Sequence, residues 1–187
     1  MDAFSYLSVV LSIILGLGLT HVLTALGRLI RHRDRVRFDW LPILWAVVLL
    51  VVFTQVWWSM FGLRTVKDWT FLAFFVVLAQ TATLYLMAAL VLPELVDESG
   101  VDLKGYYLRH NRWFFGWFLA TLAVSITKDV VLTGRLPSSE NLAFHAVLAA
   151  GCLLAIVVRQ YRAHQILGLV SAAIIATYIG LLFTHLR

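Results

Sequence analysis

The chain has 187 residues, of which 61% are hydrophobic and only 13% are charged. That charged share is about half the share in a soluble domain, so the composition excludes a soluble globular protein and indicates a membrane protein. The formal net charge of +5 comes from Lys and Arg beside apolar runs, which favours contact with membrane lipids over binding of nucleic acid. The single cysteine, Cys152, excludes an intrachain disulfide and a cysteine-rich metal site.

The first apolar stretch, residues 4–30, is expected to be a retained helix, because its positive charges follow the apolar run instead of preceding it as in a secretory signal. Small and polar residues recur along it at a spacing of four: Ser8, Ser12, Gly16, Thr20 and Thr24. In lipid, small residues at this spacing let another backbone approach closely. We therefore predict that this helix forms the packed centre of a bundle, with the small-residue stripe against another helix of the chain or a second copy.

Six runs are apolar and long enough to cross a bilayer, which needs about twenty residues per helix. They are continuously apolar, unlike the alternating strands of a membrane β-barrel. We predict an all-α, polytopic integral membrane protein, with residues 1–187 forming a single transmembrane domain with a compact bundle. The expected helices are 4–30, 41–63, 70–92, 113–132, 142–158 and 166–186.

Lys and Arg are distributed unevenly between the two sides of the predicted bundle, one with the first, third and fifth connections and the other with the second and fourth connections and the termini. Ten of the fifteen lie in or beside the first, third and fifth connections, and five of these fall between Arg28 and Arg37. Positive residues accumulate on the cytoplasmic side of membrane proteins. These connections are therefore expected in the cytoplasm, and both termini outside it, in a bacterial inner membrane.

The third connection, residues 93–112, is the longest, and an acidic patch precedes a basic one in it. Asp102 is expected to cap a short helix, running through Tyr107 or Arg109, whose Leu103, Tyr106 and Tyr107 touch the membrane. The segment is interpreted as a solvated connector, with a docking site for a cytoplasmic protein partner as the alternative.

Polar and ionisable residues gather towards the predicted outer ends of the last three helices, at similar depth. Such residues inside spans are costly and face the bundle interior or water more often than lipid. The group predicts an outward-facing polar pocket or, alternatively, only marks helix ends, where a charge costs less than the ~2.5–3.5 kcal/mol of the bilayer centre. Its members are Lys128, Asp129, His145, Tyr178 and His185.

Three further polar residues lie deeper in the predicted spans: His21, Gln55 and Gln80. Imidazole is the side chain suited to proton transfer near neutral pH, so His21 is a candidate proton relay, or else it bonds a neighbouring helix. Glutamine does not titrate, so the two glutamines predict interhelical hydrogen bonds or the lining of a pathway.

No nucleophile elbow, zinc-protease motif, phosphate-binding loop or dinucleotide motif occurs, so no catalytic residue and no metal site is predicted. The preferred interpretation is a homo-oligomeric channel or transporter for an ion, proton or small solute, surrounded by membrane lipids and without a cofactor. One alternative is a non-transporting scaffold or partner subunit. Another is a redox protein that binds quinone, or a b-type haem held by His145 and His185, although one such pair is too few for the usual two-haem route.

Overall fold

Six long α-helices make up most of the part of the chain that this computed structural model describes, residues 3–66, 68–94 and 100–182. Each is long and apolar enough to cross a membrane, so the protein is an all-α polytopic membrane protein, as the sequence predicts. The helices are α1 (Ala3–Arg31), α2 (Trp40–Met60), α3 (Phe71–Val91), α4 (Leu103–Thr133), α5 (Ser139–Val157) and α6 (Tyr161–Leu182). The connections hold the short elements η1 (Arg33–Arg35), β1 (Val36–Arg37), η2 (Phe61–Thr65) and β2 (Val101–Asp102).

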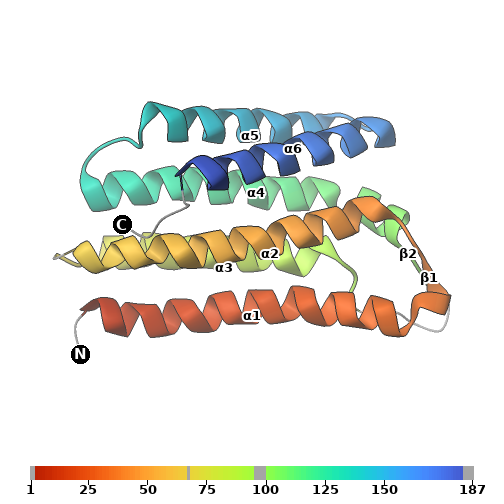
Figure 1. The fold of residues 1–187 in the computed structure, drawn as a ribbon, viewed down its shortest axis with the longest axis horizontal. Coiled ribbons are helices and arrows are strands. Elements are labelled where there is room, and N and C mark those ends of the chain that lie inside the picture. The colour runs from red at the N-terminus through yellow and green to blue at the C-terminus, as the bar shows by residue number, and fades with distance from the viewer. Residues whose placement is uncertain (1–2, 67, 95–99, 183–187) are drawn as a thin grey trace.

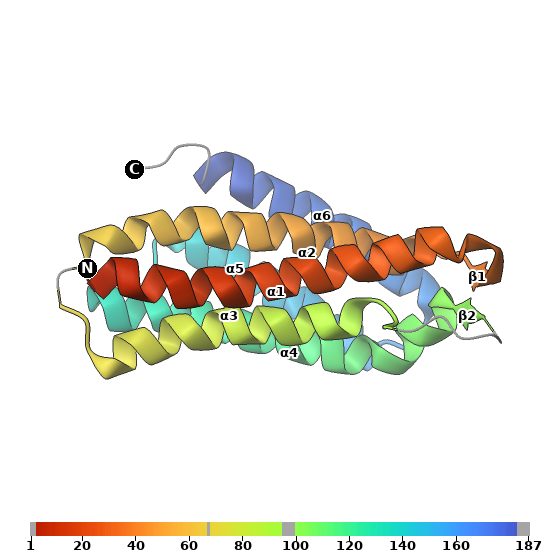
Figure 2. The same ribbon diagram turned by 90° about the horizontal axis from the view of Figure 1, so that it is seen from below.

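The helices lie side by side in an up-and-down bundle, with α1 at one edge and α5 at the other (Figure 1). α3 packs most extensively on α4, and α1 packs on α3 and α2. Seen from below, α6 diverges from α2 towards the end at which α1 begins (Figure 2). The first, third and fifth connections share the end of the bundle that carries β1 and β2, and the second and fourth share the opposite end.

The helix α1 is held by a leucine face and not by its small-residue stripe. Six of its side chains are almost fully buried: Leu7, Leu11, Leu15, Val22, Ala25 and Leu29. By contrast, Ser8, Ser12 and Gly16 are half-buried, and Thr20 and Thr24 are exposed. The predicted central place of this helix is therefore wrong, since it lies at the edge of the bundle and its stripe is outside the packed face.

The geometry of an α-helix explains why the small-residue stripe is not the packed face of α1. At 3.6 residues per turn, a spacing of four advances by about 40° at each step, so five such residues fan around the helix. The buried residues begin with the same spacing, at Leu7, Leu11 and Leu15, but steps of three and four then alternate through Gly18, Val22, Ala25 and Leu29, which returns them to one face. The close approach of α1 to α2 occurs instead at Gly18, where an added Cβ would overlap Cζ of Phe53 and lie 2.6 Å from its Cε1.

Side chains just before the helices set where several of them begin. Asp39 and Asp102 each accept a hydrogen bond from the backbone N–H two residues on, at 2.9 and 3.1 Å, and begin α2 and α4. Thr70 and Ser138 do the same for α3 and α5 from the N–H three residues on. The other end of α4 is set by Gly134, whose φ of 68° lies in the left-handed region that ends a helix.

The helix α4 begins ten residues earlier than the sequence predicts. The expected cap at Asp102 is confirmed, but the helix that follows is continuous through Thr133 and is not a short separate one. At 1.5 Å per residue, its 31 residues span about 46 Å, more than the ~30 Å of a hydrocarbon core, so its first turns extend beyond the core. Leu103 and Tyr107 are buried in the bundle, so the prediction that they touch the membrane is wrong.

Two short strands join the first and third connections at one end of the bundle. Val36 pairs with Val101 and Arg37 with Asp102, in parallel. Gly100 makes this approach possible, since its φ is 80° and an added Cβ would overlap the carbonyl oxygen of Arg35. The segment 93–112 is thus partly strand and partly helix, and its proposed role as a partner-docking site stays a prediction.

Candidate functional site

A cavity of about 350 Å³ lies between α2, α4, α5 and α6, with α3 at its inner end. The sequence assigned five residues to an outer polar pocket, and four of them line this cavity: Lys128, Asp129, His145 and Tyr178. The fifth, His185, lies outside the described residues. Gln55 and Gln80, which the sequence assigned to deeper positions, border the same cavity. The structure thus joins two groups of residues that the sequence analysis kept apart.

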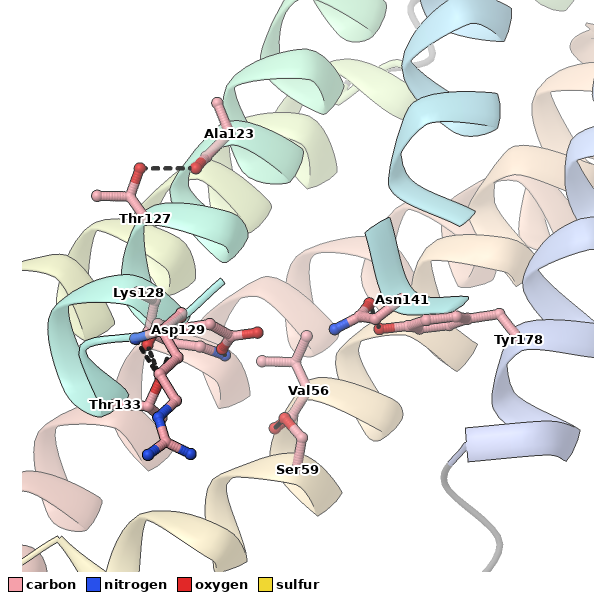
Figure 3. A network of polar contacts seen from close by, with 10 residues as sticks. Val56, Ser59, Ala123, Thr127, Lys128, Asp129, Thr133, Asn141 and Tyr178 are labelled. Carbon is pink, nitrogen blue, oxygen red and sulfur yellow. Dashed lines mark hydrogen bonds and ion pairs between the residues drawn. The ribbon is translucent and has the colours of Figure 1, made fainter. Parts of the chain in front are cut away.

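One wall of the cavity carries two opposite charges in the last turns of α4. Nζ of Lys128 lies 3.8 Å from Oδ1 of Asp129, and the two side chains are 15% and 31% exposed. Figure 3 shows this pair across an open space from Asn141 and Tyr178, with Val56 of α2 on a third side. Two half-buried charges therefore face a space large enough for a small solute.

The opposite wall is ordered by hydrogen bonds between α5 and α6. Oη of Tyr178 donates to Oδ1 of Asn141 at 3.1 Å, and its ring meets that of His145 edge-on at 6.2 Å. His145 is buried, and its Nδ1 lies 2.9 Å from the carbonyl oxygen of Asn141. Because a carbonyl oxygen only accepts, Nδ1 donates this hydrogen bond. Asn141, which the sequence analysis did not select, therefore positions both partners.

At the inner end of the cavity, Gln80 of α3 contributes a buried amide with an unsatisfied oxygen. Its side chain is only 4% exposed, and its Oε1 has no hydrogen-bond partner within the described residues. An unpaired buried acceptor costs about 1–3 kcal/mol, so this position calls for a donor from water or a solute. Thr121 and Ser125, about two turns and one turn before Lys128 on α4, also line the cavity and add hydroxyl groups.

The cavity opens at the end of the bundle where α4 gives way to α5. Gly62 and Thr65 of η2 and Thr133 at the end of α4 are exposed, and all three border it. Gln55 and Ile179 also border an apolar groove on the outside of α2 and α6, so the cavity and this groove share part of their walls.

Four buried aromatic side chains fill the bundle at the end of the cavity that faces β1 and β2. The ring of Trp45 lies 5.4, 5.3 and 6.1 Å, centroid to centroid, from those of Phe114, Phe115 and Phe118. Phe118 also borders the cavity. Beside Trp45 and Phe114 lies a space of only about 10 Å³, which is scarcely enough for one water. The cavity therefore ends at this aromatic cluster.

A second buried polar group lies beyond the aromatic cluster, at the end that carries β1 and β2. Oη of Tyr107 lies 2.9 Å from Nδ1 of His164, and Nε2 of His164 lies 2.9 Å from the carbonyl oxygen of Val158. Since the carbonyl only accepts, His164 donates through Nε2 and accepts the Tyr107 hydroxyl through Nδ1. Nearby, the Tyr161 hydroxyl donates to Oδ1 of Asp39. These bonds join α4, α6 and the start of α2.

His164 is not among the predicted site residues, because the sixth helix was expected to begin at residue 166, whereas α6 begins at Tyr161. The available signal was helical spacing, because His164, Gly168 and Ile175 form one buried face of α6. Extending that face backwards would have placed His164 inside the helix.

His21 lies apart from the cavity, in a groove between α1 and α3. Its ring meets that of Tyr85 edge-on at 6.2 Å, and its Nε2 is buried with no hydrogen-bond partner in the described part of the chain. This nitrogen therefore does not make the predicted bond to a neighbouring helix.

Within residues 3–66, 68–94 and 100–182, no three His, Cys, Asp or Glu side chains gather closely enough to hold a metal ion. The suggested haem pair, His145 and His185, extends outside the described residues and stays a prediction.

Comparison with known proteins gives no match, either to a protein-family model, to a curated protein or to a solved structure. The cavity itself is therefore the main indication of function.

Proposed function

We propose that this protein is a membrane transporter for a small polar solute, which binds in the cavity between α2, α4, α5 and α6. The observation that carries the proposal is one cavity, open at one end of the bundle, that brings the Lys128–Asp129 pair together with Gln80, whose Oε1 is unpaired among the described residues. A solute with a hydrogen-bond donor satisfies Gln80, and its charged or dipolar end is attracted by the ion pair.

The aromatic cluster supports a transporter over an open channel. Trp45 and its three phenylalanine neighbours interrupt any polar route at the floor of the cavity. Polar side chains resume beyond them at Tyr107 and His164. A bound solute would cross only if the helices rearranged around the aromatic cluster, which is the alternating access of carriers.

The positive-inside rule supports a cavity that opens outwards, because the arginine-rich connections lie at the opposite end of the bundle (Figure 1). A reporter at the C-terminus that is active only outside the cytoplasm would agree with this orientation. We also propose that the protein forms a homo-oligomer. Ser8, Ser12 and Gly16 lie outside the packed face of α1, so they could contact a helix of a second copy. The mass of the protein in detergent, measured by light scattering, tests it.

Proteoliposomes test transport directly. Radiolabelled glycine, choline, succinate and glycerol represent a zwitterion, a cation, an anion and a neutral solute, and a pH dye inside the vesicles reports proton movement. We expect uptake of at least one probe, reduced about tenfold or more in Lys128→Gln and Asp129→Asn, since each leaves the other charge unpaired. Arg135→Gln is the matched control, because Arg135 lies just beyond α4 and does not border the cavity.

A labelling experiment makes the result independent of the choice of solute. Ser125→Cys, in a Cys152→Ala background, places one thiol on the cavity wall. A cationic thiol reagent added from outside should modify it, and a transported solute should slow the reaction. If the thiol is inert from outside, and no probe enters the vesicles, the protein is not a transporter with this cavity, and the scaffold interpretation takes its place.

A further inference from the structure

A groove of about 240 Å³ lies between α1 and α3, apart from the cavity. It runs along about three turns of α1, from Leu17 to Arg28, and ends at Glu94, just beyond α3. It is lined by Leu17, Thr20, His21, Thr24, Ala25, Arg28, Tyr85 and Glu94.

His21 supplies an unsatisfied polar atom at the deep end of this groove. Nε2 is fully buried and has no hydrogen-bond partner within the described ranges, and the Tyr85 ring packs beside it. In an apolar environment such a nitrogen costs free energy unless a ligand group pairs with it. The two exposed hydroxyl groups of Thr20 and Thr24 lie alongside.

Arg28 places a positive charge at the shallow end. It follows His21 by two turns, or about 10 Å along α1, and its guanidinium donates to the backbone carbonyl oxygen of Glu94. The carboxylate of Glu94 is the one acidic group lining the groove, and Arg31 adds a second positive charge in the last turn of α1. The charges of Arg28 and Glu94 balance within the groove, and Arg31, which does not line it, adds positive charge at the end of the bundle that carries the arginine-rich first connection.

The order of these groups along α1 matches the order of groups in a phospholipid. Arg28 lies near the end of α1, His21 two turns before it, and Leu17, which is 56% exposed, one turn further in, and a phospholipid presents its phosphate, ester carbonyls and acyl chains in that order. Basic pockets between transmembrane helices near the cytoplasmic face bind anionic headgroups. The groove is open on its outer side, so a lipid enters it laterally from the bilayer.

We propose that this groove binds one anionic phospholipid. Arg28 and Thr24 hold the phosphate, and Nε2–H of His21 donates to an ester carbonyl. The proposal is independent of solute transport, because no residue of the groove borders the cavity.

Native mass spectrometry of the purified full chain tests the proposal with phosphatidylglycerol as the probe. We expect one retained lipid, bound more tightly than phosphatidylcholine. Arg28→Gln and His21→Phe should each weaken it roughly fivefold, the loss of one cationic contact or one hydrogen bond. His21→Gln keeps an amide donor and should weaken it less than His21→Phe, whereas Arg33→Gln, a control outside the groove, should leave it unchanged.

Other outcomes overturn the lipid assignment. Equal retention of phosphatidylglycerol by the wild type and by Arg28→Gln would remove the site, as would equal retention of phosphatidylcholine by the wild type. If inorganic phosphate raises the thermal unfolding midpoint as much as the lipid does, the ligand is a free anion. If the variants leave lipid binding unchanged but alter the oligomeric state, a second copy of the chain covers the groove.

Discussion

Replacing Gly18 with alanine tests which face of α1 holds it in the bundle. A Cβ at this position would overlap Cζ of Phe53 and lie 2.6 Å from Cε1. Phe53 is fully buried, so its ring has no free space to move into. The small-residue stripe makes the opposite prediction, that Gly16 is the position where an added methyl group disrupts packing.

The magnitude follows from a matched pair of variants. Gly18→Ala and Gly16→Ala both gain the same ~0.5–1 kcal/mol of helix propensity, so that contribution cancels between them. Around Gly16, a built Cβ meets no described atom within 4 Å outside its own helix turn. The difference between the two variants is therefore the overpacking cost at Phe53, about 1–3 kcal/mol.

The assay is reversible unfolding in mixed micelles, with increasing sodium dodecyl sulfate, followed by circular dichroism. Gly18→Ala should unfold at lower detergent fraction than Gly16→Ala, which should be at least as stable as the wild type. If Gly16→Ala is the less stable of the two, the stripe is a packing face and the assignment of the leucine face is refuted. The measurement is made at low protein concentration, so that contacts between copies do not contribute.

Three further variants test the cavity and the opposite end of the bundle by the same titration. Gln80→Met should stabilise the solute-free protein by about 1–3 kcal/mol, because it removes an unpaired buried oxygen, and a loss of stability would mean that the oxygen is paired. Gly100→Ala should cost about 1–2 kcal/mol and speed hydrogen exchange in β1 and β2, because its φ of 80° strains alanine; unchanged exchange would contradict this. Tyr107→Phe leaves Nδ1 of His164 unpaired and should cost about 1–3 kcal/mol, whereas Tyr6→Phe, at an exposed position on α1, should cost nothing; equal effects would rule out the Tyr107–His164 bond as the cause.

The membrane spans and the polar pocket could be predicted because both follow from the bilayer. Apolar length identifies a span whatever its neighbours are, and consecutive spans return their ends to the same depth. That rule alone brings Lys128 and Asp129, at the end of α4, to the level of His145 near the start of α5. The positions of these side chains around one cavity are consistent with that reasoning.

Rotation of each helix about its own axis was harder to predict. Gln80 lies in the cavity only because α3 turns that face towards α4, and hydropathy along α3 is nearly the same on all sides. The face of α1 was misjudged for a related reason, since serine, glycine and threonine are tolerated by lipid as well as by packing. His164 was missed because the charges around it, Arg159 and Arg162, suggested a loop.

The pairing of Val36 with Val101 also constrains how the protein is made. The two strands are separated by 65 residues, which a ribosome adds in about 3–13 s at 5–20 residues per second. During that interval the first three helices enter the bilayer without the β1–β2 pairing. Gly100 must leave the ribosome before the two strands can pair. Premature release of the nascent chain before residue 102 would therefore leave a product whose arginine-rich first connection lacks this strand pairing.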